Sequence, residues 1–400
     1  RQKRQYAERK EKADTYVNQT PFRYVERNFK SRVPPPDLSH VVDFNNLDNN
    51  LKRINDEIVE LHITNDLRSL SSLFGEHDTE WENRAHKAYG LKSSPGFIFI
   101  PNPFTPRAQR HLVKQCLSEY TLSPSTSNLD THYVTPPNGF WNLYEREHLQ
   151  DLKEGDADYF VAKKAGFTGS EQRYDSIPTP TACSREFEPV QWQPKPDPPP
   201  APSVPLLSPR ELFRKMRWTT IGCHYHWPTK TYHLDRRFPV PEDVRDLTQA
   251  VAHAVERVGY EGDKSRSWKN EYLGADFKAE AGVVNYYQYK DTLMGHVDRS
   301  ELNMDAPLVS LSLGHTCIYL LGGPTQDTVP VSIYLRSGDI VVMTKHCRQY
   351  FHGVPKIIED TLPAYLSPQT AFTDTPDWEP FGTYMQTSRI NLNVRQVFPK

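Results

Sequence analysis

The residue types that could carry out chemistry gather near the C-terminal end of the chain. His296 and Asp298 are two positions apart, and His352 is a lone histidine further on. Residues two apart on a strand point to the same face, so this imidazole and this carboxylate could reach one metal ion. A histidine from a distant strand would complete the facial triad of two imidazoles and one carboxylate, which is usual in non-haem Fe(II) oxygenases. The pattern therefore predicts an iron site with open coordination positions.

Two arginines could hold an acidic co-substrate beside such a metal. The stretch Arg389-Ile-Asn-Leu-Asn-Val-Arg395 places both guanidinium groups, with Asn391 between them, on one side of a strand. A guanidinium pairs with a carboxylate through two parallel hydrogen bonds, which an ammonium group cannot do. On its own, such a pair of arginines would instead indicate a solvent-exposed face.

Bulk composition narrows the class of protein. Lys and Arg total 48 against 50 Asp and Glu, a formal net charge of −2, so any nucleic-acid binding must come from local basic patches. The five cysteines are scattered without a C-x-x-C pair, which argues against a disulfide framework or a structural zinc site and favours a reducing compartment. No apolar run approaches the roughly 20 residues that span a bilayer, so no membrane contact is expected.

The N-terminal stretch 1–12 gives little information on location. It is cationic but contains Glu8 and Glu11, and it lacks the apolar core of a secretory signal. It could form a weak nuclear-localisation patch or the solvated start of a helix. We expect an intracellular protein, with nucleus, cytoplasm and mitochondrion not distinguished.

Hydrophobic periodicity predicts helices first and a run of strands later. Helical spacing of apolar residues indicates five helices, over 1–32, 50–74, 105–120, 210–217 and 242–258. Short β-runs between turns indicate strands at 96–101, 218–227, 283–289, 308–313, 317–321, 329–335, 340–344 and 390–397. Several short strands of this kind favour a double sheet such as a jelly roll, so the expected fold class is α+β. The proline-dense stretch 175–209 is expected to be an exposed insertion, and it could dock a protein partner.

The stretch 281–397 resembles the AlkB family of Fe(II)/2-oxoglutarate dioxygenases. Asn285-Tyr-Tyr287 lies eleven residues before His296, the family's spacing between its cofactor-contacting Asn-x-Tyr and its first metal ligand. Asp339, in a Ser-Gly-Asp turn, precedes His352 by thirteen residues, which is again the family spacing. The arginine stretch at 389–395 fits the family's closing signature Arg-x-Asn-x-x-x-Arg. The resemblance therefore rests on three independent matches.

The thirteen-residue spacing also decides between competing histidines. His315 and His346 lie in the same region as His352, and only the last has the family's distance from the Gly-Asp turn. The likeness extends to the AlkB homologue one group, over segments 22–43, 89–122, 222–227 and 279–354.

The resemblance implies a jelly-roll (double-stranded β-helix) core with N-terminal helices and a nucleotide-recognition lid. The expected parts are an N-terminal helical extension (1–88), the N-terminal part of the catalytic domain (89–174), the proline-rich insertion (175–209), a lid with its supporting helix (210–280) and the jelly-roll core (281–400). It implies Fe(II) bound by His296, Asp298 and His352, with 2-oxoglutarate and O2 at the open positions. It also implies that the co-substrate contacts are Asn285, Tyr286, Tyr287, Arg389, Asn391 and Arg395.

Family members cover the active site with a lid that grips a flipped or unpaired base by stacking. The candidate lid is 217–241, in which aromatic and basic residues alternate. The predicted substrate contacts are Trp141, Cys223, His224 and Tyr225. Two departures prevent copying the base preference of the bacterial enzyme: Cys223 replaces an aromatic residue, and Ser300, followed by Glu301, replaces an acidic one. For each aromatic residue, core packing remains an alternative.

The leading hypothesis from the resemblance is an oxidative nucleic-acid demethylase. The favoured substrate is transfer RNA bearing 1-methyladenine or 5-methylcytosine, with N6-methyladenine in DNA close behind. One rival keeps the oxygenase chemistry but takes a protein such as a histone tail as substrate. Another rival is a binding protein with a vestigial site, against which the complete triad and both arginines argue.

Overall fold

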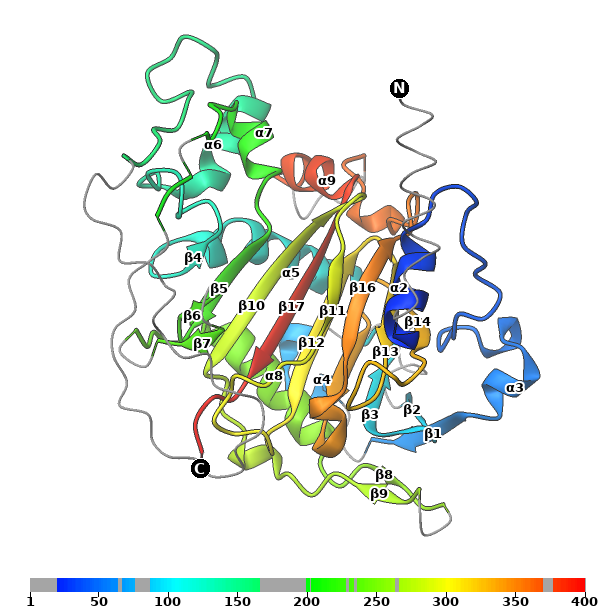
Figure 1. Cartoon of the computed structure of the whole chain (residues 1–400). Coiled ribbons are helices and arrows are strands. Elements are labelled where there is room, and N and C mark those ends of the chain that lie inside the picture. Colours follow the sequence, from blue (N-terminus) through cyan, green and yellow to red (C-terminus); the bar gives the residue numbers. More distant parts are fainter. Residues whose placement is uncertain are drawn as a thin grey trace.

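The computed structural model shows two facing sheets at the centre of the chain (Figure 1). It describes residues 20–63, 67–75, 87–165, 199–201, 203–227, 230–233, 236–262, 266–369 and 377–399. The expectations for 1–19, and for 175–198 of the proline-rich stretch, lie outside these residues.

Neighbouring strands in both sheets run antiparallel. The large sheet has nine strands, in the order β1 (Ile58–His62), β2 (Lys87–Leu91), β3 (Ser94–Ile100), β15 (Ile340–Met343), β12 (Leu308–Gly314), β17 (Ser388–Arg395), β10 (Ala281–Gln288), β5 (Trp218–Gly222) and β4 (Thr126–Ser127). The small sheet has four, in the order β11 (Leu293–His296), β16 (His352–Ile357), β13 (Cys317–Leu321) and β14 (Val331–Leu335). Two short hairpins pair β6 (Tyr225–His226) with β7 (Thr231–Tyr232), and β8 (Gly259–Tyr260) with β9 (Trp268–Lys269).

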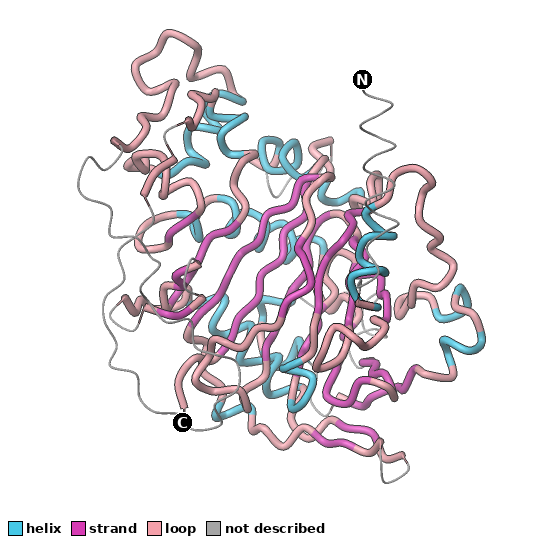
Figure 2. The backbone as a smooth tube through the Cα atoms, viewed as in Figure 1, coloured by secondary structure: helices cyan, strands magenta, loops and turns pink. Residues whose placement is uncertain are grey.

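The helices lie outside the two sheets (Figure 2). The α-helices described are α2 (Pro21–Lys30), α3 (Lys52–Asn55), α4 (Leu67–Leu70), α5 (Pro106–Leu117), α6 (Gly139–His148), α7 (Pro209–Phe213), α8 (Glu242–Ala254) and α9 (Glu379–Met385). Short 3-10 turns add η1 (Leu47–Asn49), η2 (Ser72–Phe74), η3 (Glu119–Thr121), η5 (Gly274–Asp276), η6 (Lys345–Gln349) and η7 (Ala364–Leu366). No helix within the described ranges combines the length and apolarity that a membrane crossing requires.

The alternation of side chains along each strand builds the layers. On β17, Ile390 and Leu392 join the core between the large sheet and helices such as α5 and α8, whereas Arg389 and Asn391 point to the other face, between the sheets. The same alternation on β13 turns Ile318 and Leu320, two positions apart, outward against α2. The result is a helix layer, two sheets and an outer helix, the jelly-roll arrangement expected from the short strands.

The expected helix over 50–74 is wrong. Among its described residues, the helical pieces are the four-residue segments Lys52–Asn55 and Leu67–Leu70 and the 3-10 turn Ser72–Phe74. Ile58–His62 forms β1, whose residues pair with β2 from Ile58 opposite Leu91 onward. The spacing of the apolar residues fits a helix, but edge pairing with β2 and burial of Leu61 override that local pattern. Residues assigned to a helical extension therefore extend the large sheet. The strand expected over 218–227 is divided into β5, Trp218–Gly222, in the large sheet and β6, Tyr225–His226, in a separate hairpin. The other expected helices and strands in the described ranges are present, with ends shifted by a few residues.

Candidate metal and co-substrate site

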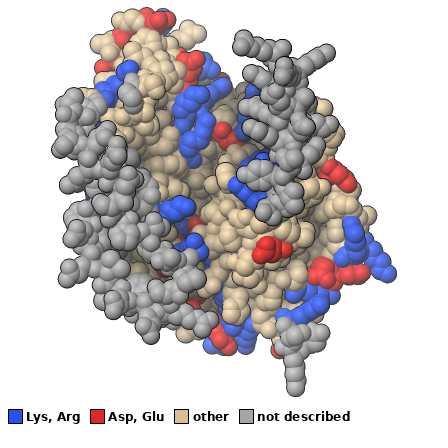
Figure 3. Space-filling model, viewed as in Figure 1, with Lys and Arg blue, Asp and Glu red and all other residues tan. Residues whose placement is uncertain are grey.

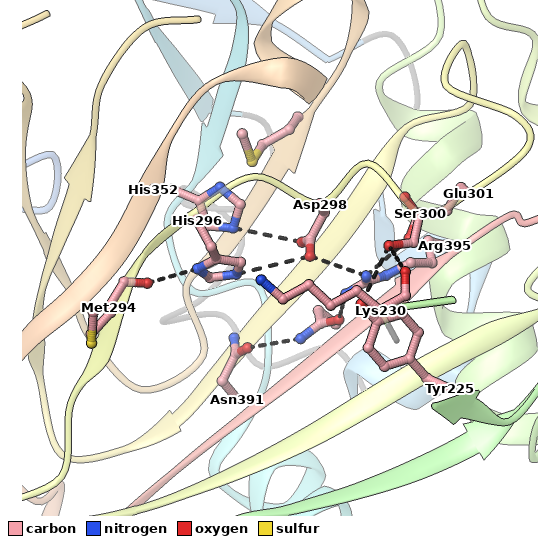
Figure 4. Close-up of polar contacts among 12 residues, drawn as sticks. Tyr225, Lys230, Met294, His296, Asp298, Ser300, Glu301, His352, Asn391 and Arg395 are labelled. Carbon is pink, nitrogen blue, oxygen red and sulfur yellow. Dashed lines mark hydrogen bonds and ion pairs between the residues drawn. The ribbon is translucent and has the colours of Figure 1, made fainter. Parts of the chain in front are cut away.

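Three side chains from two segments of the chain, His296 and Asp298 from one and His352 from the other, converge on one point (Figure 4). His296 ends β11, His352 begins β16, and Asp298 lies two residues beyond the end of β11. His296 and His352 are opposite one another in the register of β11 and β16, and their ring centroids are 4.4 Å apart. One potential ligand atom from each of the three residues lies within 4.8 Å of the other two. The triad that the spacing predicted is thus brought together at metal-binding distance.

Backbone carbonyls set the tautomer of both histidines. The Nδ1 atom of His296 lies 2.9 Å from the Met294 carbonyl oxygen, and that of His352 lies 3.2 Å from the Tyr350 carbonyl oxygen. A carbonyl oxygen can only accept, so each Nδ1 must carry the proton. Each Nε2 is then left as a lone-pair donor, and these atoms lie 3.8 Å and 3.6 Å from the Asp298 carboxylate oxygens. Both rings are therefore oriented for metal ligation before any ion binds.

The electrostatics of the triad also favour a cation. Burial alone would raise the pKa of Asp298, but Arg395 and the two imidazoles hold it well below its usual range. Burial and the neighbouring His352 lower the pKa of His296 to about 4. The carboxylate is therefore ionised and the His296 imidazole neutral at neutral pH, which are the protonation states that metal ligands need.

Arg389 is a buried cation that lacks an anionic partner among the described residues. Only 1% of it is exposed, and its guanidinium donates to the Ser312 hydroxyl at 2.8 Å and to the His315 carbonyl at 3.3 Å. Its Nε is buried without a hydrogen-bond partner. A buried charge left without an opposite charge is costly. The residue therefore fits a carboxylate ligand supplied from outside the chain.

The other predicted co-substrate residues divide between the two faces of the large sheet. Asn285 and Tyr287 lie opposite Asn391 and Arg389 in the pairing of β10 with β17, and this row faces the space between the sheets. Tyr286 does not join them. It packs in the core beneath the helices, where its hydroxyl donates to the Cys116 carbonyl. The prediction that Tyr286 contacts the co-substrate is wrong, because neighbouring residues on a strand face opposite sides.

The β6–β7 hairpin places one predicted substrate residue at the triad. The Ser300 hydroxyl donates to the Lys230 carbonyl at 2.8 Å and accepts from the Tyr225 hydroxyl at 3.3 Å, so Tyr225 is fastened to the loop that carries Asp298. The Lys230 side chain extends across the same region (Figure 4). Cys223 is buried in a small apolar cluster.

His224, also predicted to contact substrate, is turned away from the triad. Its Nδ1 lies 2.8 Å from the Thr126 hydroxyl, and its ring lies 5.1 Å from that of His233. Neither His224 nor Cys223 presents a surface to a base, so both substrate assignments are corrected.

Trp141 also belongs to the core. It is 3% exposed and stacks between Tyr144 and Phe381, with ring centroids at 4.7 Å and 4.6 Å. No face of the indole is left for a base. The sequence around Trp141 aligns it with a substrate-contacting tryptophan of the family. That sequence context did not reveal which way the α6 helix turns the side chain of Trp141.

Two residues of the site were not predicted from the sequence. Arg348, in η6, donates to the Asp298 carbonyl at 3.1 Å and lies 3.3 Å from the Glu301 carboxylate. Glu301 was noted only as the neighbour of a replaced position, yet its Oε1 also accepts from Arg395 at 3.0 Å. Both lie in stretches rich in charged and polar residues, so their residue type carried no signal, and their partners lie 42 to 94 residues away in the chain.

Fold and triad together define an oxygenase of the jelly-roll type, and the sequence profile of the 2OG-Fe(II) oxygenase superfamily matches residues 181–395. The chain belongs to this superfamily, whose members use Fe(II), 2-oxoglutarate and O2.

Similar proteins with curated names narrow the resemblance further. The proteins named nucleic acid dioxygenase ALKBH1 from Mus musculus and Homo sapiens are each 35% identical over 326 residues, which is 78% of this chain and 66% of theirs. DNA N(6)-methyladenine demethylase ALKBH1A from Arabidopsis thaliana is 27% identical, over 96% of this chain and 97% of that protein. The tRNA demethylase abh1 from Schizosaccharomyces pombe is 39% identical, over 49% of this chain and 57% of that protein. The resemblance to the AlkB homologue one group is confirmed, although the chain spans only 66% of the length of the two mammalian relatives.

Proposed function

We propose that this chain is an Fe(II)/2-oxoglutarate-dependent demethylase of methylated nucleic acid, and that its substrate is 1-methyladenine in transfer RNA. The observation that carries the proposal is the Tyr225–Tyr232 hairpin, which is tied to the triad loop at Tyr225 and exposes an aromatic side chain, Trp227, to solvent. An enzyme that acts on a base must take it out of the stack and hold it against such side chains.

Each residue of the site has a definite part in this proposal. His296, Asp298 and His352 would hold Fe(II) through the two Nε2 atoms and the carboxylate. When bound, Fe(II) with 2-oxoglutarate and O2 supplies the hydroxylation of an N-methyl group, with succinate and CO2 as co-products and formaldehyde released from the hydroxymethyl base. Arg389 would bind the far carboxylate of 2-oxoglutarate, because its unpaired Nε and its burial leave it in need of an anion. Oxidation of 5-methylcytosine would use the same arrangement.

Three aromatic rings lead from solvent towards the triad. Trp227 is 38% exposed, and its ring lies 5.1 Å from that of Trp218 and 4.9 Å from that of Tyr225. Trp218 opposes Asn285 in the pairing of β5 with β10, so it lies at the edge of the co-substrate row. Stacking is worth about 1–3 kcal/mol per base and tolerates any sequence. This row of rings supports a nucleobase, rather than a peptide side chain, as the group that enters.

Basic residues border the same approach. Arg214, Lys215 and Arg217 lie between α7 and β5, and Lys215 is exposed. Figure 3 shows lysine and arginine side chains on this face of the molecule, where α7 leads into β5. Because the chain as a whole is slightly acidic, a local basic border of this kind supports contact with phosphates.

The test is to incubate the protein with Fe(II), ascorbate and 2-oxoglutarate on transfer RNA that carries 1-methyladenine, and to follow the nucleosides by mass spectrometry. We expect loss of 1-methyladenine that requires both Fe(II) and 2-oxoglutarate and is absent in Asp298→Ala. Unchanged nucleosides with intact succinate formation would contradict the choice of substrate but not the oxygenase chemistry.

A second candidate substrate is N6-methyladenine in DNA. The name of the Arabidopsis thaliana relative, which aligns over almost the whole of this chain, favours it. A parallel assay on single-stranded and duplex oligonucleotides with N6-methyladenine separates the two candidates. If the substrate were instead a histone tail, the protein would hydroxylate the peptide. Its affinity for nucleic acid would then not fall as the salt concentration rises.

A further inference from the structure

A buried carboxylate three residues beyond Asp298 joins four segments of the chain. The side chain of Glu301 has no exposed surface, and its Oε1 lies 3.0 Å from Nη1 of Arg395 on β17. The Tyr232 hydroxyl of the hairpin donates to the same oxygen at 2.9 Å, and Arg348 of η6 lies 3.3 Å from Oε2. One acid therefore contacts a strand of the large sheet, the segment before β16 and the β6–β7 hairpin.

Arg348 holds the loop that carries Asp298 at three points. Its Nε donates to the Ala306 carbonyl at 3.1 Å, its Nη1 to the Asp298 carbonyl at 3.1 Å, and its Nη2 to the Glu301 carboxylate at 3.3 Å. It is 1% exposed and lies four residues before His352. The fork geometry of a guanidinium allows three fixed contacts of this kind, whereas an ammonium offers a point charge. Arg348 thus ties the segment that supplies one histidine to the loop that supplies the carboxylate.

Glu301 also shares a cation with Asp298. Nη1 of Arg395 lies 3.2 Å from Asp298 Oδ1 and 3.0 Å from Glu301 Oε1. Because two carboxylates divide one guanidinium, the charge of Asp298 is only partly neutralised by Arg395. Without the charge of Glu301, Arg395 would pair with Asp298 alone and compete with a metal for it.

We propose that Glu301 and Arg348 are positioning residues of the metal centre: together they fix the backbone of Asp298 relative to His352 and keep Arg395 from neutralising the metal-binding carboxylate. This inference rests on the proposed iron site but not on any choice of substrate. Residues behind the ligands commonly act in this way, and their loss costs about 10- to 100-fold in metal affinity or activity.

A buried ion pair can also be a purely structural feature, and such pairs are weak evidence for stability. A structural role would show in thermal unfolding alone, whereas a positioning role must show in metal affinity measured on folded protein. We therefore choose to measure Mn(II) binding by Glu301→Gln and Arg348→Lys in the absence of nucleic acid. The electron paramagnetic resonance signal of free Mn(II) reports the binding. The first substitution keeps the side-chain shape and removes the negative charge; the second keeps the positive charge and removes the guanidinium fork.

The expected result is a rise of about 10- to 100-fold in the Mn(II) dissociation constant for each variant at a temperature where it is folded. Arg336→Lys is the matched control. Arg336 pairs with Asp43 at 2.6 Å and directly follows Leu335 of β14. Leu335 and Ile357 of β16 both align with Cys317 of β13, at the far end of the small sheet from His352. Its substitution should lower the unfolding temperature and leave Mn(II) affinity unchanged.

Two results would overturn the inference. One is wild-type Mn(II) affinity in folded Glu301→Gln and Arg348→Lys; the other is an equal loss of affinity in Arg336→Lys. If neither of the first two variants folds, the pair is structural and the proposal fails. A wild-type chain that binds Mn(II) tightly but leaves transfer RNA unchanged would refute the proposed substrate and leave this inference standing.

Discussion

Arg395, which is buried, and Asp298, which is partly buried, form an ion pair, with Nη1 3.2 Å from Oδ1, at the point where β17 meets the metal-binding loop. The arginine that the closing signature assigns to the co-substrate region therefore contacts the metal-binding carboxylate itself. Its second acid, Glu301, keeps it paired when Asp298 is occupied by a metal. This ion pair connects the metal-binding carboxylate with β17, the strand that also carries Arg389.

We predict that Asp298→Ala abolishes turnover without unfolding the protein. The substitution removes a metal ligand, but Arg395 keeps Glu301 as its acidic partner, so no buried cation is left alone. Succinate formation should fall to background and Mn(II) binding should be lost, while the thermal midpoint changes little. Residual 2-oxoglutarate turnover at the wild-type rate would contradict the assignment of the triad.

Arg389→Met should act in opposite directions on stability and on co-substrate binding. The guanidinium is buried without an acidic partner among the described residues, so an apolar side chain of similar volume should leave the 2-oxoglutarate-free protein as stable or more stable. Loss of a charged hydrogen-bonding partner, worth about 1.5–3 kcal/mol, should weaken 2-oxoglutarate binding by at least about tenfold. Calorimetric titration of 2-oxoglutarate onto the Mn(II)-loaded protein measures the second effect, and thermal unfolding without ligand measures the first. A large drop in stability together with unchanged affinity would show that Arg389 is structural.

Predictions from the sequence succeeded where a pattern indicated the direction in which a side chain points as well as its residue type. Arg389 and Arg395 share a face because six positions separate them on one strand, and the same period of two should have excluded Tyr286, which lies between Asn285 and Tyr287. Trp141 was misjudged because local context does not reveal which face of a helix meets the core. Arg348 could not be found at all, since its three acceptors come from positions 42 to 50 residues earlier in the chain.

Acid should destabilise the metal-free protein through His315. This buried imidazole donates from Nε2 to the Gln386 carbonyl at 2.9 Å and accepts at Nδ1 from the Thr361 amide at 3.2 Å, so a second proton would displace an N–H donor. Burial lowers the pKa of His315 below its ordinary value of 6.5. The unfolded chain then binds the proton more readily, and the free energy of unfolding must fall as pH drops below about 6.5. Urea unfolding at several pH values should show a smaller acid-dependent loss in His315→Gln than in the exposed control His346→Gln; equal losses would contradict the prediction.

Trp141→Ala should damage stability and not substrate affinity. The ring stacks between Tyr144 and Phe381 in the core, and truncation of a buried tryptophan costs about 3–5 kcal/mol. We expect a clear fall in the free energy of unfolding, measured by urea denaturation, and an unchanged KM for methylated transfer RNA in the fraction that remains folded. A raised KM at unchanged stability would restore the substrate role that the sequence context indicated.

Trp227→Ala should produce the reverse pattern and therefore tests the hairpin as the substrate lid. Its ring is 38% exposed and contacts Trp218 and Tyr225 rather than the main core, so the thermal midpoint should change little. Loss of one stacking surface worth about 1–3 kcal/mol should raise KM for the methylated nucleic acid by about 5- to 150-fold. Mn(II) and 2-oxoglutarate affinities should stay at wild-type values, because Trp227 touches neither the triad nor the arginine row. The comparison with Trp141→Ala is decisive, because one substitution should affect unfolding and the other substrate binding. An unchanged KM in Trp227→Ala would mean that the base binds elsewhere.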